Sequence, residues 1–171
     1  MKLVDDILKG GDLRSIGKSN YVVSLIKDQE GFDELFKQLF HANRIVVMRA
    51  ADAIEKITIN SPDYLIKHKS KILKLLDTAK NIELKWHLAL LVSRVCLVPK
   101  EARKVWQVLT TWAKNKEESK IVRVNSIQGL FNLSNKNTAL KNDLDATVTE
   151  IERENIPSIN ARIKKLKNVH G

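Results

Sequence analysis

The sequence is poor in residues that cross-link a chain or break its helices, with one cysteine, three prolines and six glycines among 171 residues. A lone cysteine excludes an intramolecular disulfide. Cys96 lies in the apolar run 88–98, which predicts a small core side chain in a reducing compartment. A structural zinc site needs four clustered ligands, and none of the four histidines lies three to five residues from another histidine or from Cys96. We therefore expect no disulfide, no metal centre and no cofactor.

Long apolar runs are also absent. No stretch approaches the ~18 uninterrupted apolar residues of a membrane-spanning helix. The start of the chain carries Asp5 and Asp6, which do not fit a secretory signal. These features predict a cytoplasmic protein that does not associate with membranes. Apolar residues still make up 43% of the chain, which is enough for the buried core of one domain covering residues 1–171.

Acidic residues are outnumbered by basic ones, 20 to 30, which gives a formal net charge of +10. Such a balance favours an acidic partner, whether nucleic acid, an acidic protein surface or anionic lipid. The alternative explanation is that a helical protein is basic for solubility alone. Aromatic residues form only 5% of the chain and leave few side chains for stacking on bases.

Small or apolar residues recur at intervals of 38 residues. The five positions of the pattern are occupied in succession by Val46, Ala50, Ala53, Ile54 and Ile57, by Leu84, Leu88, Leu91, Val92 and Val95, and by Val122, Ser126, Gly129, Leu130 and Leu133. A fixed period of this length is typical of solenoids, in which stacked helix pairs bury their apolar faces against one another. The sequence therefore predicts an all-α solenoid of about four helix pairs with a period of 38.

Turn residues mark the ends of the second helix of each pair, at 60–62, 98–99 and 135–137. The first helices are then predicted at 32–41, 62–78, 99–114 and 138–154. Residues 1–30 are interpreted as a degenerate N-terminal repeat, with a helix that runs to about Lys27. Residues 155–171 are interpreted as a C-terminal capping helix with a solvated, basic outer face.

Several segments of the chain resemble HEAT repeats. They lie at 14–18 and 22–23, at 32–36, at 47–56 with its Ala-Ala-x-Ala-Ile sequence, at 86–89 and at 121–123. The match looks closest to small bacterial single-domain HEAT-repeat proteins, and it extends from about Asp12 to Leu166. The resemblance implies a right-handed α-solenoid of HEAT-like helix pairs that acts as a binding surface. It implies no particular activity.

Polar residues form a second pattern with the same period. Its three columns are Arg49, His87 and Asn125; Asp52, Leu90 and Gln128; and Lys56, Arg94 and Asn132, with Arg14 and Lys18 extending the second and third columns toward the N-terminus. In a HEAT-type stack the second helices line the concave face, so these columns would form a mostly cationic groove with Trp86 at its margin. The alternative is structural, because Arg49 and Asp52 are spaced to pair on one helix and ladders between repeats also serve packing.

Two functions fit this groove. The first is a monomeric, non-enzymatic binding scaffold that presents a basic concave groove to a protein or peptide partner. The alternative is a nucleic-acid-binding protein that uses the same groove for phosphate contacts, by analogy with a HEAT-like DNA glycosylase whose catalytic motif is not found here. Trp106 shares the spacing of Ala102, Val105 and Leu109 and is predicted to lie in the core.

The two enzyme-like motifs of the sequence do not fit the predicted fold. Gly17-Lys18-Ser19 is similar to the end of a phosphate-binding P-loop, but Asp12 stands where that motif needs a glycine, and an all-α chain lacks its strand. His87 and Cys96 are nine residues apart, which would place them on opposite faces of one helix and excludes a Cys–His pair. We therefore expect no catalytic residues.

Overall fold

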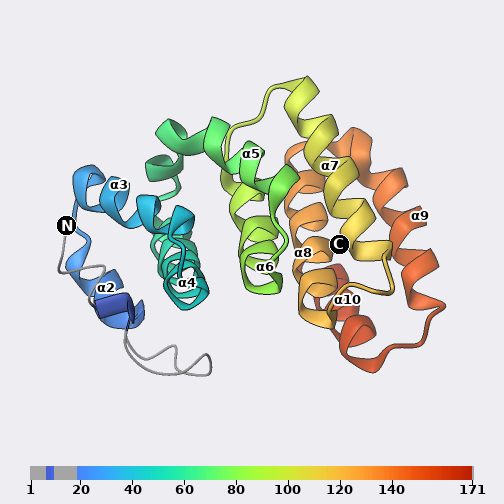
Figure 1. Ribbon diagram of the computed structural model, residues 1–171. Helices are drawn as coiled ribbons and strands as arrows, with labels where there is room; N and C mark the ends of the chain where they lie inside the picture. The colour runs from blue at the N-terminus through green and yellow to red at the C-terminus, as the bar shows by residue number, and fades with distance from the viewer. Residues whose placement is uncertain (1–6, 10–18, 171) are drawn as a thin grey trace. The chain divides into compact units, whose positions relative to one another are not determined.

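A computed structural model of the chain describes residues 7–9 and 19–170 (Figure 1). Every secondary-structure element in these residues is a helix, which confirms the predicted all-α class. The chain divides into two compact units, unit 1 at residues 1–69 and unit 2 at residues 70–171. Each unit has its own buried apolar core.

Unit 1 is built around its longest helix. Its elements are α2 (Ser19–Leu25), α3 (Gln29–Lys37), η1 (Gln38–Phe40), α4 (Arg44–Asn60) and η2 (Pro62–His68). Helix α4 packs against α2, α3, η1 and η2. The Asn43 side chain starts α4 by accepting a hydrogen bond from the backbone N–H of Ile45 at 2.9 Å. Pro62 follows its last turn and cannot continue it.

Unit 2 is also organised around a central helix. Its elements are α5 (Lys69–Thr78), which begins at the unit boundary, α6 (Ile82–Leu91), η3 (Val92–Arg94), α7 (Pro99–Lys114), α8 (Lys120–Lys136), η4 (Thr138–Leu140), α9 (Lys141–Glu152) and α10 (Pro157–His170). Helix α8 packs against α6, α7, α9 and α10. Buried residues lie all round α8, as expected for a helix enclosed by neighbours.

The positions of the 38-residue apolar pattern are buried. All three sets of the 38-residue pattern, from Val46 to Leu133, lie in the interior of their own unit. Trp106 is buried as predicted. At Gly129 a β-carbon would lie 2.5 Å from the carbonyl oxygen of Ala89, which shows that α8 and α6 approach closely at this glycine. The apolar periodicity therefore identified the packing faces correctly.

Helix boundaries agree in part with the sequence. Helix α7 has the predicted bounds, whereas the predicted helix 62–78 consists of η2 followed by α5. The predicted helix 138–154 begins as η4 and ends, as α9, at Glu152. Both 3₁₀ segments are the first turns of longer helical stretches, where such tightening is common.

The environment of Cys96 differs from the prediction. The second helix of this pair ends with η3 at Arg94 and not at Val98, and the chain is extended at Val95 (φ −77°, ψ 144°). Successive side chains of an extended segment point to opposite sides. Val95 is therefore buried and Cys96 is exposed, so Cys96 is not a core residue.

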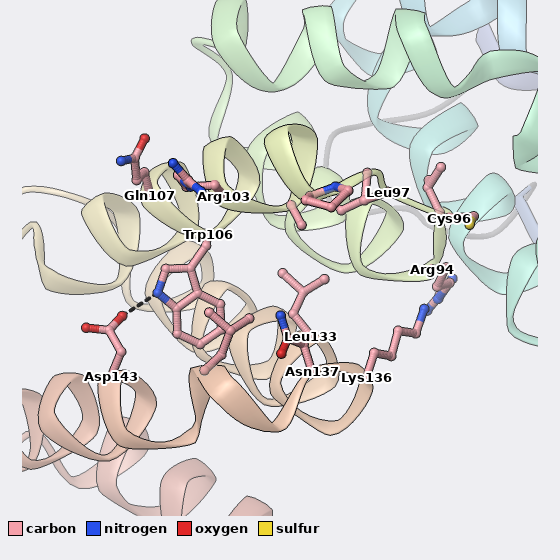
Figure 2. A pocket seen from close by; sticks show the side chains of 14 residues that line it. Arg94, Cys96, Leu97, Arg103, Trp106, Gln107, Leu133, Lys136, Asn137 and Asp143 are labelled. Atoms are coloured by element: carbon pink, nitrogen blue, oxygen red, sulfur yellow. Dashed lines mark hydrogen bonds between the residues drawn. The ribbon is translucent and has the colours of Figure 1, made fainter.

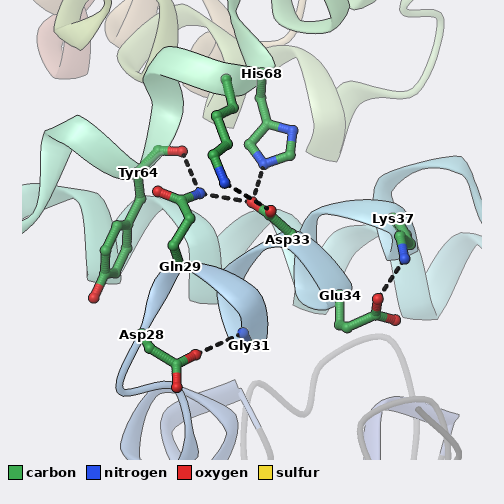
Figure 3. Close-up of polar contacts among 9 residues, drawn as sticks. Asp28, Gln29, Gly31, Asp33, Glu34, Lys37, Tyr64 and His68 are labelled. Carbon is green, nitrogen blue, oxygen red and sulfur yellow. Dashed lines mark hydrogen bonds and ion pairs between the residues drawn. The ribbon is translucent and has the colours of Figure 1, made fainter.

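A polar cluster joins α3 to η2 in unit 1 (Figure 3). The Asp33 carboxylate accepts from the Gln29 amide at 2.6 Å and contacts His68 Nε2 at 2.8 Å, and Lys67 Nζ lies 3.6 Å away. The hydrogen bond from Gln29 holds the pKa of Asp33 below its ordinary value of 3.8; partial burial opposes this, and His68 and Lys67 reinforce it. His68 is buried and stacks on Phe36, with ring centroids 3.9 Å apart. The charged form of Asp33 thus helps to hold unit 1 together.

We expect the Asp33→Asn substitution to make the free energy of unfolding depend less on pH in the acidic range. A carboxyl whose pKa is lowered by folding stabilises the protein above its unfolded pKa, and this contribution is lost as the pH falls below about 4 through the folded pKa. Urea denaturation across this range measures the slope of the unfolding free energy against pH. The control is Asp63→Asn, which changes an exposed aspartate in η2. Equal slopes in both variants and the wild type would contradict the role given to Asp33.

Candidate binding pocket

Unit 2 contains a cavity of about 890 Å³ that opens between the start of α7 and the end of α8 (Figure 2). Its lining comes from five segments that are separate in the sequence: η3 and the loop after it, α7, α8, η4 and α9. The extended residues 95–98 create this opening, because they separate the end of η3 from the first turn of α7. The volume lies in the range of small-ligand and peptide pockets.

The floor of the cavity is apolar. Trp106, Leu133 and Leu140 line it from α7, α8 and η4, and Leu97 and Pro99 line the part near the loop. The Trp106 indole N–H donates to the Asp143 carboxylate of α9. This bond fixes the indole plane and satisfies the donor that burial would otherwise leave unpaired. The pocket therefore has a rigid wall able to receive an apolar side chain.

Charged groups surround this floor. Arg94, Arg103 and Lys136 line the cavity together with one carboxylate, that of Asp143, so the lining carries a net charge of +2. Lys136 ends α8 and donates from Nζ to the carbonyl oxygen of Ser93 at 2.8 Å. This bond holds the Lys136 ammonium beside η3, at the residue that precedes Arg94.

The charges are unevenly placed. Figure 2 shows the Arg94 and Lys136 side chains at the same end of the pocket as Cys96, whereas Asp143 lies at the opposite end beside Trp106. The apolar floor lies between the two ends. Arg103 lies on the Trp106 side, so an elongated ligand would meet two cations at one end, an apolar surface in the middle and one cation with one carboxylate at the other end.

The first column of the predicted groove is buried and does not form an exposed surface. Arg49 is 1% exposed and donates from Nη1 to the carbonyl oxygen of Leu8 at 2.8 Å. His87 is 5% exposed and packs edge-on against the half-buried Trp86. Asn125 is 8% exposed and donates from Nδ2 to the Trp86 carbonyl at 3.2 Å. These contacts tie each side chain to the interior of its own unit, so their role there is structural.

The other two columns lie at half-buried positions and link helices within each unit. In unit 1 the Lys56 ammonium lies 2.6 Å from the Asp52 carboxylate and 2.7 Å from Asn20 Oδ1, and the Ser19 hydroxyl also donates to Asp52. These bonds connect α4 with α2. Arg14 and Lys18 lie outside the described residues.

In unit 2 the same columns form a chain of side-chain amides along α8. Arg162 of α10 donates to Gln128 Oε1 at 3.3 Å, Gln128 donates to Asn132 Oδ1 at 3.0 Å, and Asn132 donates to Ser93 Oγ at 3.1 Å. The chain ends at η3, where Arg94 enters the pocket lining. Of the predicted groove residues, Arg94 is the one that lines the cavity.

Of the other pocket residues, Val95 and Leu133 belong to the apolar pattern, but the charged ones lie outside both periodic patterns. Cys96 and Trp106 were assigned to the core, and Arg103, Lys136 and Asp143 were not singled out. Two predicted helix ends, at 98–99 and 135–137, border this cavity. The sequence therefore predicted the two helix ends that border the cavity, but it did not predict that they lie close together in space.

Three further observations bear on function. Within residues 7–9 and 19–170, no group of three or more His, Cys, Asp or Glu side chains is arranged to hold a metal ion. None of the described helices is both long and apolar enough to cross a bilayer. In comparisons with known proteins, no family model matches the chain, and no curated protein or solved structure matches it significantly.

Proposed function

We propose that this protein is a non-enzymatic binding scaffold of the HEAT-like α-solenoid type, which acts as a cytoplasmic monomer and holds a protein or peptide partner in the unit 2 pocket. The observation that carries the proposal is the pocket itself, an 890 Å³ cavity with an apolar floor and three cationic side chains in its lining. Aromatic and arginine side chains dominate the binding energy of protein interfaces, and both are present.

The helix positions support the solenoid part of this proposal. Helices α4, α6 and α8 begin at residues 44, 82 and 120, at intervals of 38 residues. Several hydrogen bonds within each unit join residues about one such interval apart, including Arg49 to Leu8 over 41 residues, Asn125 to Trp86 over 39 and Trp106 to Asp143 over 37. Contacts between each repeat and its neighbour are what a solenoid requires.

A protein partner suits the pocket better than a nucleic acid does. Proteins that bind single strands stack bases on exposed aromatic faces. Trp106 and Trp112 are 6% and 8% exposed, and the Trp106 indole is bonded to Asp143. They offer no open stacking platform, whereas an apolar floor suits an aliphatic or aromatic side chain of a partner.

Charge reversal at the pocket tests the proposal. We expect the double substitution Arg103→Glu with Lys136→Glu to lower the affinity for the partner recovered from native lysate by at least about tenfold. Two of the three pocket cations would then repel an acidic partner. The matched control is Lys164→Glu with Lys165→Glu, which reverses two exposed charges on α10. Binding titrations compare the two double variants, with circular dichroism to confirm that both are folded.

The possible outcomes separate the candidate functions. Loss of partner binding in the pocket variant alone supports the binding-scaffold function. Equal losses in both double variants would indicate diffuse attraction to a chain of net charge +10 and contradict a specific pocket. Capture that disappears after nuclease treatment, with affinity falling steeply as salt rises, would favour the nucleic-acid alternative.

A further inference from the structure

We infer that the unit 2 pocket selects one kind of peptide segment, an acidic stretch anchored by a single large apolar side chain, and that it binds this segment in one direction. The acidic residues lie at the end formed by Arg94 and Lys136, and the anchor lies on the floor beside Trp106. This inference rests on the proposed function, because it names the partner of the same pocket.

The anchor follows from the shape and chemistry of the floor. Trp106, Leu133 and Leu140 present apolar surface from three elements, and the bond to Asp143 holds the indole in place. A preorganised apolar pocket loses little side-chain entropy when a ligand enters it. A leucine or aromatic side chain fills such a site, whereas a wholly polar peptide would leave the floor without a partner.

The acidic part follows from the cationic end. Lys136 has three N–H donors, and the carbonyl of Ser93 accepts from one of them at 2.8 Å. The ammonium is therefore held in place while still able to donate to a ligand. Arg94 lines the same end, and its guanidinium has the planar geometry that binds carboxylates with two hydrogen bonds. Two cations at one end fit one or more aspartate or glutamate side chains.

The direction of binding follows from Asp143. Its carboxylate lies at the end away from Arg94 and Lys136 and accepts from the Trp106 indole (Figure 2). An acidic residue placed there would meet this carboxylate as well as Arg103, whereas at the other end it would meet two cations and no carboxylate. A segment with its acids at the Cys96 end avoids this repulsion. Asp143 is thus a specificity-determining residue that rejects the reversed orientation.

Selection from a displayed library of random peptides on the intact chain tests the inference without a known partner. We expect the enriched peptides to combine a leucine or aromatic residue with aspartate or glutamate on one side of it. Cys96 reports the site directly, because it is the single cysteine of the chain, is exposed and lines the cationic end. A bound peptide should slow alkylation of Cys96 by iodoacetamide at least about tenfold, since it covers the thiol.

Matched variants sharpen the test. Lys136→Ala should lower the affinity for an enriched peptide about tenfold. Lys164→Ala, on an exposed face of α10, should leave that affinity unchanged. Asp143→Asn should allow peptides with the acids on the other side of the anchor to bind, which a purely structural Asp143 would not do. The folded state of each variant is checked by circular dichroism.

The peptide selection has different outcomes if the inference fails and if the proposed function fails. Enriched peptides that lack acids, lack an apolar anchor or leave Cys96 alkylation unchanged overturn the inference, yet they still show a peptide-binding scaffold. A library that yields no enriched peptide above an unrelated helical protein overturns the peptide-binding function together with the inference. Enrichment of both acid orientations on the wild-type chain overturns the role given to Asp143.

Discussion

Replacing Gly129 by alanine is expected to lower the free energy of unfolding by about 1–3 kcal/mol, and replacing it by leucine should cost more. A β-carbon at this position would lie 2.5 Å from the carbonyl oxygen of Ala89 and 2.9 Å from Leu109 Cδ1. The nearer atom belongs to the backbone of α6, so no change of side-chain rotamer relieves the contact. Helices α6 and α8 would have to separate, which disturbs the packing at the centre of unit 2. Urea denaturation followed by circular dichroism measures the loss.

Gly31 provides the matched control. It also lies in a helix, α3, but a β-carbon there would have only side-chain atoms nearby, the closest being Asp28 Oδ1 at 3.2 Å. Because alanine favours the helical conformation more than glycine does, Gly31→Ala should leave stability unchanged or raise it slightly. A Gly129→Ala variant as stable as the wild type would show that α8 does not approach α6 in this register.

Periodicity predicted the packing faces because the spacing of apolar residues along a helix determines which of its faces is apolar. The spacing of Ala53, Leu91 and Gly129 predicts that they lie on buried faces, and all three are buried in the structure. The end of α6 was not predictable in the same way. The apolar run through Val98 indicated a continuous helix, but the Ser93 hydroxyl bonds to the Leu90 carbonyl and the chain becomes extended at Val95. The hydropathy pattern therefore does not show where this helix ends.

The functional surface was harder to predict, because exposure depends on contacts that are distant in sequence. Arg49 is charged and was assigned to a groove, yet the carbonyl of Leu8 gives its guanidinium a partner inside unit 1. Asn125 has its partner in the Trp86 carbonyl, 39 residues away. Conversely, Lys136 and Asp143 line one cavity with Arg103 because α8 and α9 pack against α7. A repeat pattern aligns equivalent positions but does not show which of them face a cavity.

Arg123 carries the second buried guanidinium of the described residues and forms an ion pair with Glu154 in unit 2. It is 2% exposed and donates from Nη2 to both carboxylate oxygens of Glu154 at 2.9 Å, while its Nε donates to the Ala113 carbonyl at 2.8 Å. These bonds connect α8 to the end of α7 and to the turn after α9. Because a buried cation needs a counter-ion, the burial of this guanidinium depends on the carboxylate beside it.

Removing that carboxylate by Glu154→Ala is therefore expected to destabilise the protein by about 3 kcal/mol, since it leaves a positive charge buried without a counter-ion. The double variant Arg123→Met with Glu154→Ala should recover part of the loss, because methionine replaces the charge with apolar volume. Glu150→Ala serves as the control: its carboxylate pairs with Lys114 at 2.7 Å but is 60% exposed, and exposed pairs contribute less than about 1 kcal/mol. Chemical denaturation of the four proteins completes the comparison. A double variant less stable than Glu154→Ala, or equal losses at Glu154 and Glu150, would mean that the energy of the pair does not come from burial of the Arg123 charge.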